Sequence, residues 1–268
     1  MLDTIFNEDC FVTMENMPIG QCDVILTSPF YNTNEKAGKN RTLNNTRVKS
    51  GQYDYVRYDV HVDSMTNEEY CDFTVRLFEN FDRILNLNGV VLYNISYGSK
   101  GCDNLIDVIH SVIHETNFTL ADTIVWKKST ALPNSCSPNK LTRIWEFVFV
   151  FCCKAEFKTF HSNKQVTSYR KTGQKAYENI VNFVEAKNND GSCPYNKATY
   201  STDLCKQLLT IYAPPGGVVY DPFMGTGTTA LAAKELGLHY LGSEISENQV
   251  KWATERLETF DIDSFLDS

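Results

Sequence analysis

The chain has 268 residues, of which 42% are hydrophobic, and a formal net charge of −8. This length can bury a substantial core, so we expect a single domain over residues 1–268. The sequence holds no long apolar run and no recognisable signal peptide, so we expect no membrane segment. Its nine cysteines are irregularly spaced and include no C-x-x-C pair. This usage predicts reduced thiols in an intracellular protein, cytoplasmic or nuclear if eukaryotic, with neither disulfides nor a metal.

Strand and helix patterns alternate along most of the chain. In chain order they are a strand at 23–27, a helix from the capping box Thr66-x-x-Glu69 to Gly89, a strand at 90–95, a helix at 105–113, strands at about 118–126 and 146–151, a strand at 218–220, a helix at 228–236, a strand at 240–244 and a helix capped by Ser246. This alternation predicts an α/β fold.

The first informative string is Thr27-Ser28-Pro29-Phe30-Tyr31, which follows the apolar run Asp23–Thr27. A rigid turn here places a hydroxyl, two carbonyls and an aromatic ring at the sheet edge, where a planar amine can bind. Taken alone, Ser28 reads more simply as a turn or cap serine and Tyr31 as an aromatic at the rim of the core. A second string changes that balance.

This second string is Asp221-Pro222-Phe223-Met224-Gly225-Thr226-Gly227-Thr228-Thr229, which follows the strand Val218–Tyr220. Its glycines permit a tight turn and a close approach to a ligand. Glu244 follows about twenty residues later, a spacing suited to ribose hydroxyls in a nucleotide-type fold. The string lacks the full G-x-G-x-x-G pattern and the lysine of a phosphate loop, which disfavours a pyrophosphate ligand and a nucleotide-dependent oxidoreductase. Both strings leave the carboxyl ends of strands and should meet in space.

Together the strings resemble the DNA amino-methyltransferases of the permuted (β) group, the adenine-N6/cytosine-N4 family. Their signature is Ser/Asp-Pro-Pro-Tyr, followed later by Asp-Pro-Phe-x-Gly-x-Gly-Thr-Thr, and the resemblance covers almost the whole chain. It implies a Rossmann-like fold with a mostly parallel sheet, helices on both faces and circularly permuted motifs. It also implies methyl transfer from S-adenosyl-L-methionine to the exocyclic amino group of a flipped base in DNA, the DNA being the partner.

The resemblance also assigns the residues. The catalytic turn is Ser28, Pro29, Phe30 and Tyr31, in which Ser28 and the Pro29 carbonyl accept from the amine and Tyr31 stacks on the flipped base. Phe30 replaces the usual second proline, which loosens the turn. The residues implied to bind the cofactor are Asp9, Thr199, Asp221, Phe223, Gly225, Thr226, Gly227, Thr228 and Glu244. We expect Asp221→Ala to abolish cofactor binding with little effect on thermal unfolding.

Basic residues are concentrated in two stretches. Residues 127–175 carry ten Lys or Arg against two Glu, a net charge of +8, and residues 31–60 carry six against three acids, a net +3. Beside the two motifs, such stretches predict a face for DNA phosphates, although solvated loops or a protein interface remain open. We expect a DNA-facing loop at 32–58 and a target-recognition insertion at about 129–196. The candidate DNA-binding residues are Lys39, Arg41, Arg47, Lys49, Lys128, Lys164, Arg170 and Lys171.

The target base, the wider function and the oligomeric state stay open from the sequence. Thr-Ser-Pro-x-Tyr is more typical of cytosine-N4 enzymes, but adenine-N6 enzymes are the larger set, so both bases remain candidates. The alternative functions are a catalytically silent nucleic-acid-binding partner subunit and an RNA amino-methyltransferase. A homodimer is possible, and the recognition sequence depends on loop geometry that one chain does not reveal.

Overall fold

The computed structural model describes residues 2–32, 65–96, 103–131, 133, 138, 139, 141–191, 193, 196 and 199–266, with side chains as far as residue 260. Most of the expected loop at 32–58, with Lys39, Arg41, Arg47 and Lys49, therefore lies outside the described residues. No described helix is long and apolar enough to cross a membrane.

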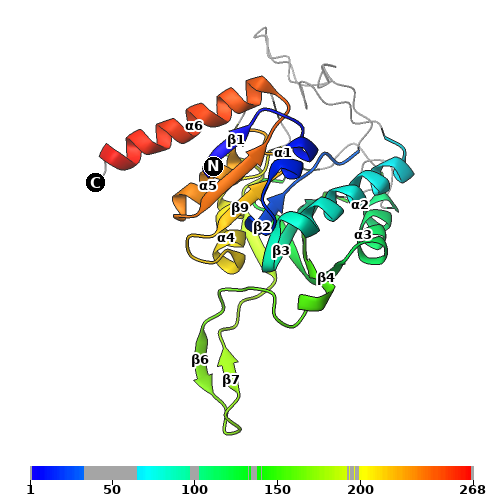
Figure 1. Cartoon of the computed structure of the whole chain (residues 1–268), viewed down its shortest axis with the longest axis vertical. Coiled ribbons are helices and arrows are strands. Elements are labelled where there is room, and N and C mark those ends of the chain that lie inside the picture. The colour runs from blue at the N-terminus through cyan, green and yellow to red at the C-terminus, as the bar shows by residue number, and fades with distance from the viewer. Residues whose placement is uncertain are drawn as a thin grey trace.

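The elements alternate as the sequence pattern predicts (Figure 1). They are β1 Thr4–Phe6, α1 Cys10–Asn16, β2 Cys22–Thr27, α2 Asn67–Ile84, β3 Leu85–Ile95, α3 Asp103–Glu115, β4 Phe118–Lys128, β5 Trp145–Cys153, the 3-10 turn η1 Lys154–Glu156, β6 Val166–Tyr169, β7 Lys175–Tyr177, β8 Phe183–Ala186, α4 Thr202–Tyr212, β9 Val218–Asp221, α5 Thr228–Glu235, β10 His239–Ser243 and α6 Glu247–Leu266.

Eight strands form one sheet in the order β1-β10-β9-β2-β3-β5-β4-β8. Every neighbouring pair is parallel except the two that involve β5, which runs antiparallel to β3 and β4. β2 and β9 are neighbours in this sheet. The strand that follows β2 in the chain, β3, lies on one side of this pair, and the strand that follows β9, β10, lies on the other side. The crevice between the carboxyl ends of β2 and β9 is therefore the switch point at which open α/β sheets bind ligands.

Helices cover both faces of the sheet, as the resemblance implies. On one face α1, α2 and α3 pack over side chains such as Ile25, and α2 lies beside α3 (Figure 1). On the other face α4, α5 and α6 pack over Val24 and Leu26. Successive residues of β2 thus enter opposite cores, because strand side chains alternate between faces. β2 is accordingly apolar on both sides.

The helix expected to run to Gly89 ends five residues earlier, at Ile84. Leu85 already has an extended backbone and pairs with Cys22 of β2, and an irregularity follows before Val90 pairs with Val24. Gly89 lies in that irregularity, where a Cβ would come within 2.8 Å of the Leu85 side chain. Pairing with β2 therefore overrides the helical spacing, and the strand expected at 90–95 is confirmed.

An aromatic cluster under α2 dominates one core. The ring of Phe78 has its centroid 5.1–5.5 Å from those of Phe81, Tyr93, Phe118 and Phe151, and Phe78 is fully buried. These rings come from a helix and three strands, so the cluster ties α2 to the sheet.

We expect Phe78→Ala to lower the free energy of unfolding by about 3–5 kcal/mol, because it removes a large buried ring and leaves a cavity. Urea denaturation followed by circular dichroism measures this loss. Leu87→Ala is the control, since that side chain is 81% exposed and should change stability little. Equal midpoints for both variants would contradict the packing role of Phe78.

Candidate active site at the carboxyl ends of β2 and β9

The expected catalytic turn follows directly from the last residue of β2, Thr27. Ser28 Oγ lies 2.9 Å from the Tyr31 hydroxyl and 3.1 Å from Oδ1 of Asn94, and the Tyr31 hydroxyl donates to the same Asn94 oxygen over 2.9 Å. Tyr31 also lies 3.4 Å from a carboxylate oxygen of Glu146, which is paired with Lys128. The turn therefore presents its two hydroxyls to a polar network built from β3, β4 and β5.

Phe30, the residue that departs from the family pattern, points into the protein. Its side chain is only 8% exposed, and its ring packs 5.3–6.2 Å from those of Tyr70, Phe73 and Phe223. Its carbonyl oxygen accepts a hydrogen bond from the Tyr70 hydroxyl. The loosening expected from the missing proline is therefore countered by an aromatic cluster and a hydrogen bond from α2.

Asp221 ends β9 and is 1% exposed. Its carboxylate accepts four hydrogen bonds, from Thr27 Oγ1 (2.9 Å), Tyr200 (3.0 Å), Thr229 Oγ1 (2.6 Å) and the backbone N–H of Phe223 (3.0 Å). Burial raises the pKa of this carboxyl, and these hydrogen bonds oppose the rise. Asp221 thus joins both motifs to α5 and to the segment before α4. This burial runs against the expectation that Asp221→Ala leaves thermal unfolding nearly unchanged.

A cavity of ≈ 260 Å³ opens at this crevice. Seven of the nine expected cofactor residues line it, namely Asp9, Thr199, Phe223, Gly225, Thr226, Thr228 and Glu244, together with Ser28 and Phe30 of the catalytic turn. The other two, Asp221 and Gly227, are absent from the lining. Most of the expected residues therefore lie together at the crevice. Asp221 and Gly227 act on the cavity only through the residues that line it.

Acidic groups surround one part of the cavity. Glu244 accepts hydrogen bonds from the backbone N–H groups of Gly225 (2.9 Å) and Ser246 (2.8 Å). These bonds orient its carboxylate against the glycine turn, residues 225–227. Asp9 caps α1 by accepting from Phe11 N, and Glu8 accepts from Thr13. Carboxylates attract a cation, and the apolar rings of the lining suit a flat base. This donor set fits S-adenosyl-L-methionine, a sulfonium cation that carries an adenine.

The two glycines of the second string have different neighbours. Both have a positive φ, +54° at Gly225 and +79° at Gly227. A Cβ at Gly225 would meet the side chains of Asn196 and Gln249, which also line the cavity, each at 3.4 Å. A Cβ at Gly227 would lie 2.7 Å from Cβ of Ala253 in α6. Gly227 therefore permits helix packing, whereas Gly225 keeps the cavity open.

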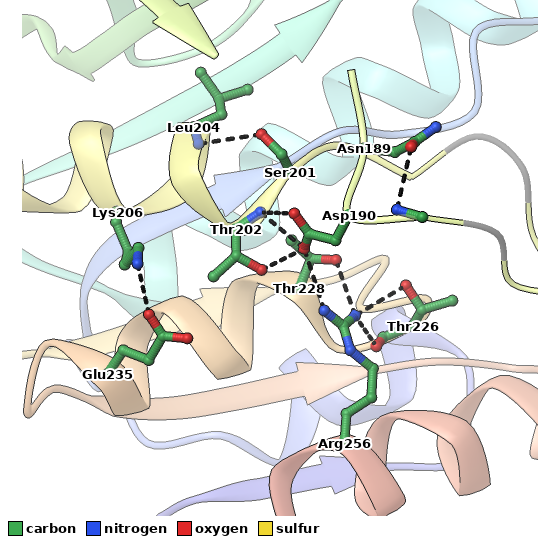
Figure 2. A network of polar contacts seen from close by, with 11 residues as sticks. Asn189, Asp190, Ser201, Thr202, Leu204, Lys206, Thr226, Thr228, Glu235 and Arg256 are labelled. Carbon is green, nitrogen blue, oxygen red and sulfur yellow. Dashed lines mark hydrogen bonds and ion pairs between the residues drawn. The ribbon is translucent and has the colours of Figure 1, made fainter. Parts of the chain in front are cut away.

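Arg256 of α6 supports the glycine turn from behind, as Figure 2 shows. Its guanidinium donates to the carbonyl of Thr226 (2.8 Å), to Thr228 Oγ1 (3.3 Å) and to Asp190 (3.2 Å). Asp190 in turn accepts from the backbone N–H of Thr202 at the start of α4. This ion pair joins the turn to the segment that carries Thr199. Neither partner is evident from the sequence, because the two lie 66 residues apart.

Most of the expected basic face lies away from the cavity. β5 begins with Trp145 beside Lys127 and ends with Cys153 beside Phe118, so it carries the chain to the amino edge of the parallel strands. The loop after it is anchored there by a hydrogen bond from His161 N to the Asn88 carbonyl. Figure 1 shows the β6–β7 hairpin projecting beyond this edge.

The described basic residues of 127–175 therefore do not lie together at one edge of the sheet, and their binding of DNA stays a prediction. Lys164, Arg170 and Lys171 belong to the hairpin region at the far edge, whereas Lys128 ends β4 at the edge of the catalytic turn. The expected insertion at 129–196 is likewise interrupted, since β5 and β8 within it belong to the main sheet. Among the described residues, no group of three or more His, Cys, Asp or Glu could hold a metal ion.

Comparison with known proteins gives consistent results. A family model described as DNA methylase matches residues 22–255. The chain is 23% identical to the Type II methyltransferase M.BglII of Bacillus subtilis, over 96% of this chain and 69% of the relative. It is 25% identical to the Type II methyltransferase M.HinfI of Haemophilus influenzae, over 96% of this chain and 68% of the relative.

Solved structures share the fold. The PvuII DNA methyltransferase, described as cytosine-N4-specific, superposes with a TM-score of 0.66 at 15% identity, covering 94% of this chain and 84% of that one. The M1.HpyAVI–SAM complex superposes with a TM-score of 0.58 at 20% identity, covering 95% of this chain and 98% of that one.

We expect Asp221→Ala to cost about 3 kcal/mol of unfolding free energy or more, because it leaves several buried donors without an acceptor. Chemical denaturation measures this loss, and Asp72→Ala, an exposed acid on α2, is the matched control. Calorimetry with S-adenosyl-L-methionine should show weakened binding through the displaced turn. Unchanged stability would show that the four hydrogen bonds contribute little.

Proposed function

The chain belongs to the DNA methylase family, and from this we propose how its two motifs divide the work of methyl transfer to DNA. As a member of this family it is a DNA methyltransferase that uses S-adenosyl-L-methionine and modifies the exocyclic amino group of adenine or cytosine. The observation that carries the proposal is the meeting of the Ser28 turn with a cavity lined by the glycine turn and Glu244.

The cofactor site is the cavity between β2 and β9. We assign Glu244 to the ribose hydroxyls, because its carboxylate is already oriented by Gly225 and Ser246. Thr199 and Thr226 also line the cavity, and we assign them to the methionine end of the cofactor. When bound, S-adenosyl-L-methionine supplies an electrophilic methyl group on a sulfonium. Asp221 and Gly227 support the site without lining it.

The catalytic turn activates and positions the amine. The nitrogen lone pair of an exocyclic amine is delocalised into the base, so the amine is a weak nucleophile. When Ser28 Oγ and the Pro29 carbonyl accept its hydrogens, electron density returns to nitrogen and the lone pair can be aimed at the methyl group. Alignment of the reacting atoms supplies much of the remaining rate. The ring of Tyr31 is assigned to stacking on the flipped base.

We place DNA at the carboxyl edge of the sheet, where a flipped base can reach Ser28. The described basic residues on this side include Lys128 and Arg143, at either end of the connection between β4 and β5. Leu141, which is 88% exposed, lies in the same connection, and the partly exposed Trp145 follows it. An exposed apolar side chain beside a flipping pocket suits contact with unstacked bases. We therefore narrow the target-recognition region to about 129–144.

Three finer assignments remain proposals. The intact hydroxyl network at Ser28 favours an active enzyme over a catalytically silent partner subunit. The seven cysteines found free among the described residues agree with an intracellular location. A homodimer stays a prediction, which sedimentation equilibrium would measure.

The test of function is the product. Incubating the protein with DNA and S-adenosyl-L-methionine, then digesting the DNA to nucleosides for mass spectrometry, should give N6-methyladenine or N4-methylcytosine. Ser28→Ala should lower the rate by roughly 10²-fold because one acceptor is removed, whereas Ser168→Ala on the exposed hairpin should not. No methylated nucleoside from any DNA, or methylation of RNA in preference to DNA, would overturn the proposal.

The placement of DNA is tested by salt dependence. Arg143→Ala should weaken DNA binding and lower the slope of log affinity against log salt by roughly one unit for each phosphate that it no longer neutralises. The double variant Lys164→Ala/Lys171→Ala should leave that slope unchanged, because both residues lie at the far edge. The reverse result would return the DNA face to the β6–β7 side.

A further inference from the structure

Asn94 lies on β3 directly beside the catalytic turn, and the sequence motifs do not include it. Its side chain is 2% exposed and makes three hydrogen bonds. The amide nitrogen donates to the carbonyl of Phe147 on β5 over 2.9 Å. The amide oxygen accepts from Ser28 Oγ at 3.1 Å and from the Tyr31 hydroxyl at 2.9 Å. Asn94 therefore connects a sheet backbone group to both hydroxyls of the turn.

The sheet determines which way this amide points. In the antiparallel pair of β3 and β5, Asn94 is opposite Val148, and the Phe147 carbonyl reaches across to its amide nitrogen. Turning the amide over would place its oxygen against that carbonyl and its N–H₂ against the hydroxyls. Two acceptors facing each other are repulsive, and a buried unpaired carbonyl is costly. The oxygen of Asn94 thus faces Ser28 and Tyr31 whether or not substrate is bound.

This orientation determines the hydrogens of the two hydroxyls. Each hydroxyl has one hydrogen to donate and can also accept. With a fixed acceptor at Asn94, the Ser28 hydrogen points into the protein, either to Asn94 directly or to the Tyr31 oxygen. Ser28 also lines the cavity, so the lone pairs of its oxygen are left for a group that enters there. A donor such as an amine N–H is the partner that this arrangement accepts.

We propose that Asn94 is a positioning residue for methyl transfer, which holds the Ser28 hydroxyl as a hydrogen-bond acceptor toward the substrate amine. The inference rests on the proposed role of Ser28 in the reaction. Asn94 acts through Ser28 and does not contact the reacting atoms. It supplies in advance the acceptor geometry that water or a freely rotating serine would have to find during the reaction.

The first experiment is a double-mutant cycle measured as single-turnover methyl transfer, with DNA and S-adenosyl-L-methionine saturating. Asn94→Ala should lower the rate by roughly 10²-fold, the size expected when a reacting group is misplaced. Cofactor affinity measured by calorimetry should stay unchanged. Combined with Ser28→Ala, it should cause no further decrease, because both changes remove the same acceptor. Multiplying effects in the double variant would overturn the inference.

A matched control separates positioning from folding. Asn163 is another asparagine whose amide donates to backbone carbonyls, those of Thr210 and Ala213, but it lies at the opposite edge of the sheet. Asn163→Ala should lower thermal stability without changing the single-turnover rate at a temperature where both variants are folded. Should Asn163→Ala slow the reaction as much as Asn94→Ala, the effect is structural and the inference fails.

The pH profile of Asn94→Asp gives an independent readout. When protonated, the new carboxyl can donate to the Phe147 carbonyl and accept from the hydroxyls, as the amide does. Once ionised it can only accept, and its charge faces that carbonyl. Activity of this variant should therefore be present at low pH and disappear as pH rises through the carboxyl pKa, a decline that the unmodified protein lacks. A flat ratio of variant to unmodified rate would contradict the inference.

The outcomes also separate the inference from the proposed function. A reduced rate in Ser28→Ala with full rate in Asn94→Ala overturns the role of Asn94 alone. Full rate in Ser28→Ala overturns the proposed role of Ser28, and the role of Asn94 with it.

Discussion

The hydrogen bond of 2.9 Å from Thr27 Oγ1 to the Asp221 carboxylate joins the two strand ends on which the site is built. β2 and β9 are neighbours in the sheet although their ends are 194 residues apart in the chain. Asp221 also accepts from Tyr200, Thr229 and the Phe223 N–H, so it holds the catalytic turn, the glycine turn and the segment before α4 in one arrangement. A buried carboxylate is costly unless its lone pairs are used. Here that requirement makes Asp221 a strong constraint on the geometry of the whole crevice.

A second buried acceptor has a corresponding role on the catalytic side. Asp221 organises the cofactor crevice between β2 and β9, and Asn94 organises the hydroxyls between β2 and β5. Both are buried polar groups in central strands of the sheet. Each is hydrogen-bonded to groups from more than one part of the fold. The site is thus preorganised by the sheet, and its outer parts can vary without disturbing the acceptors.

The distribution of charge shows how strand direction changes the meaning of a sequence pattern. Residues 127–175 carry a net charge of +8 and read as one basic stretch beside the motifs. Because β5 is antiparallel, it divides this stretch between opposite edges of the sheet, with Lys128 near the catalytic turn and Lys171 on the β6–β7 hairpin. Total charge in a segment is a property of the chain, whereas a binding face requires side chains on the same surface. For this reason our proposal puts the phosphate contacts at the carboxyl edge alone.

The sequence by itself determined the α/β class, the family and seven of the nine residues expected at the cofactor cavity, because local signals carry them. Ser28–Tyr31 and Asp221–Thr229 are contiguous strings whose turn chemistry is readable without neighbours. The sequence patterns did not predict α1 and α4. They also predicted that α2 continues beyond Ile84, whereas pairing of Leu85 with Cys22 ends the helix there. Only the tertiary structure showed Asn94, Arg256 and Asp190 in the site, and Asp221 behind the cavity wall instead of in it. Their roles arise from hydrogen bonds such as Ser28 to Asn94 and Arg256 to Asp190, each between residues 66 positions apart, which no local pattern records.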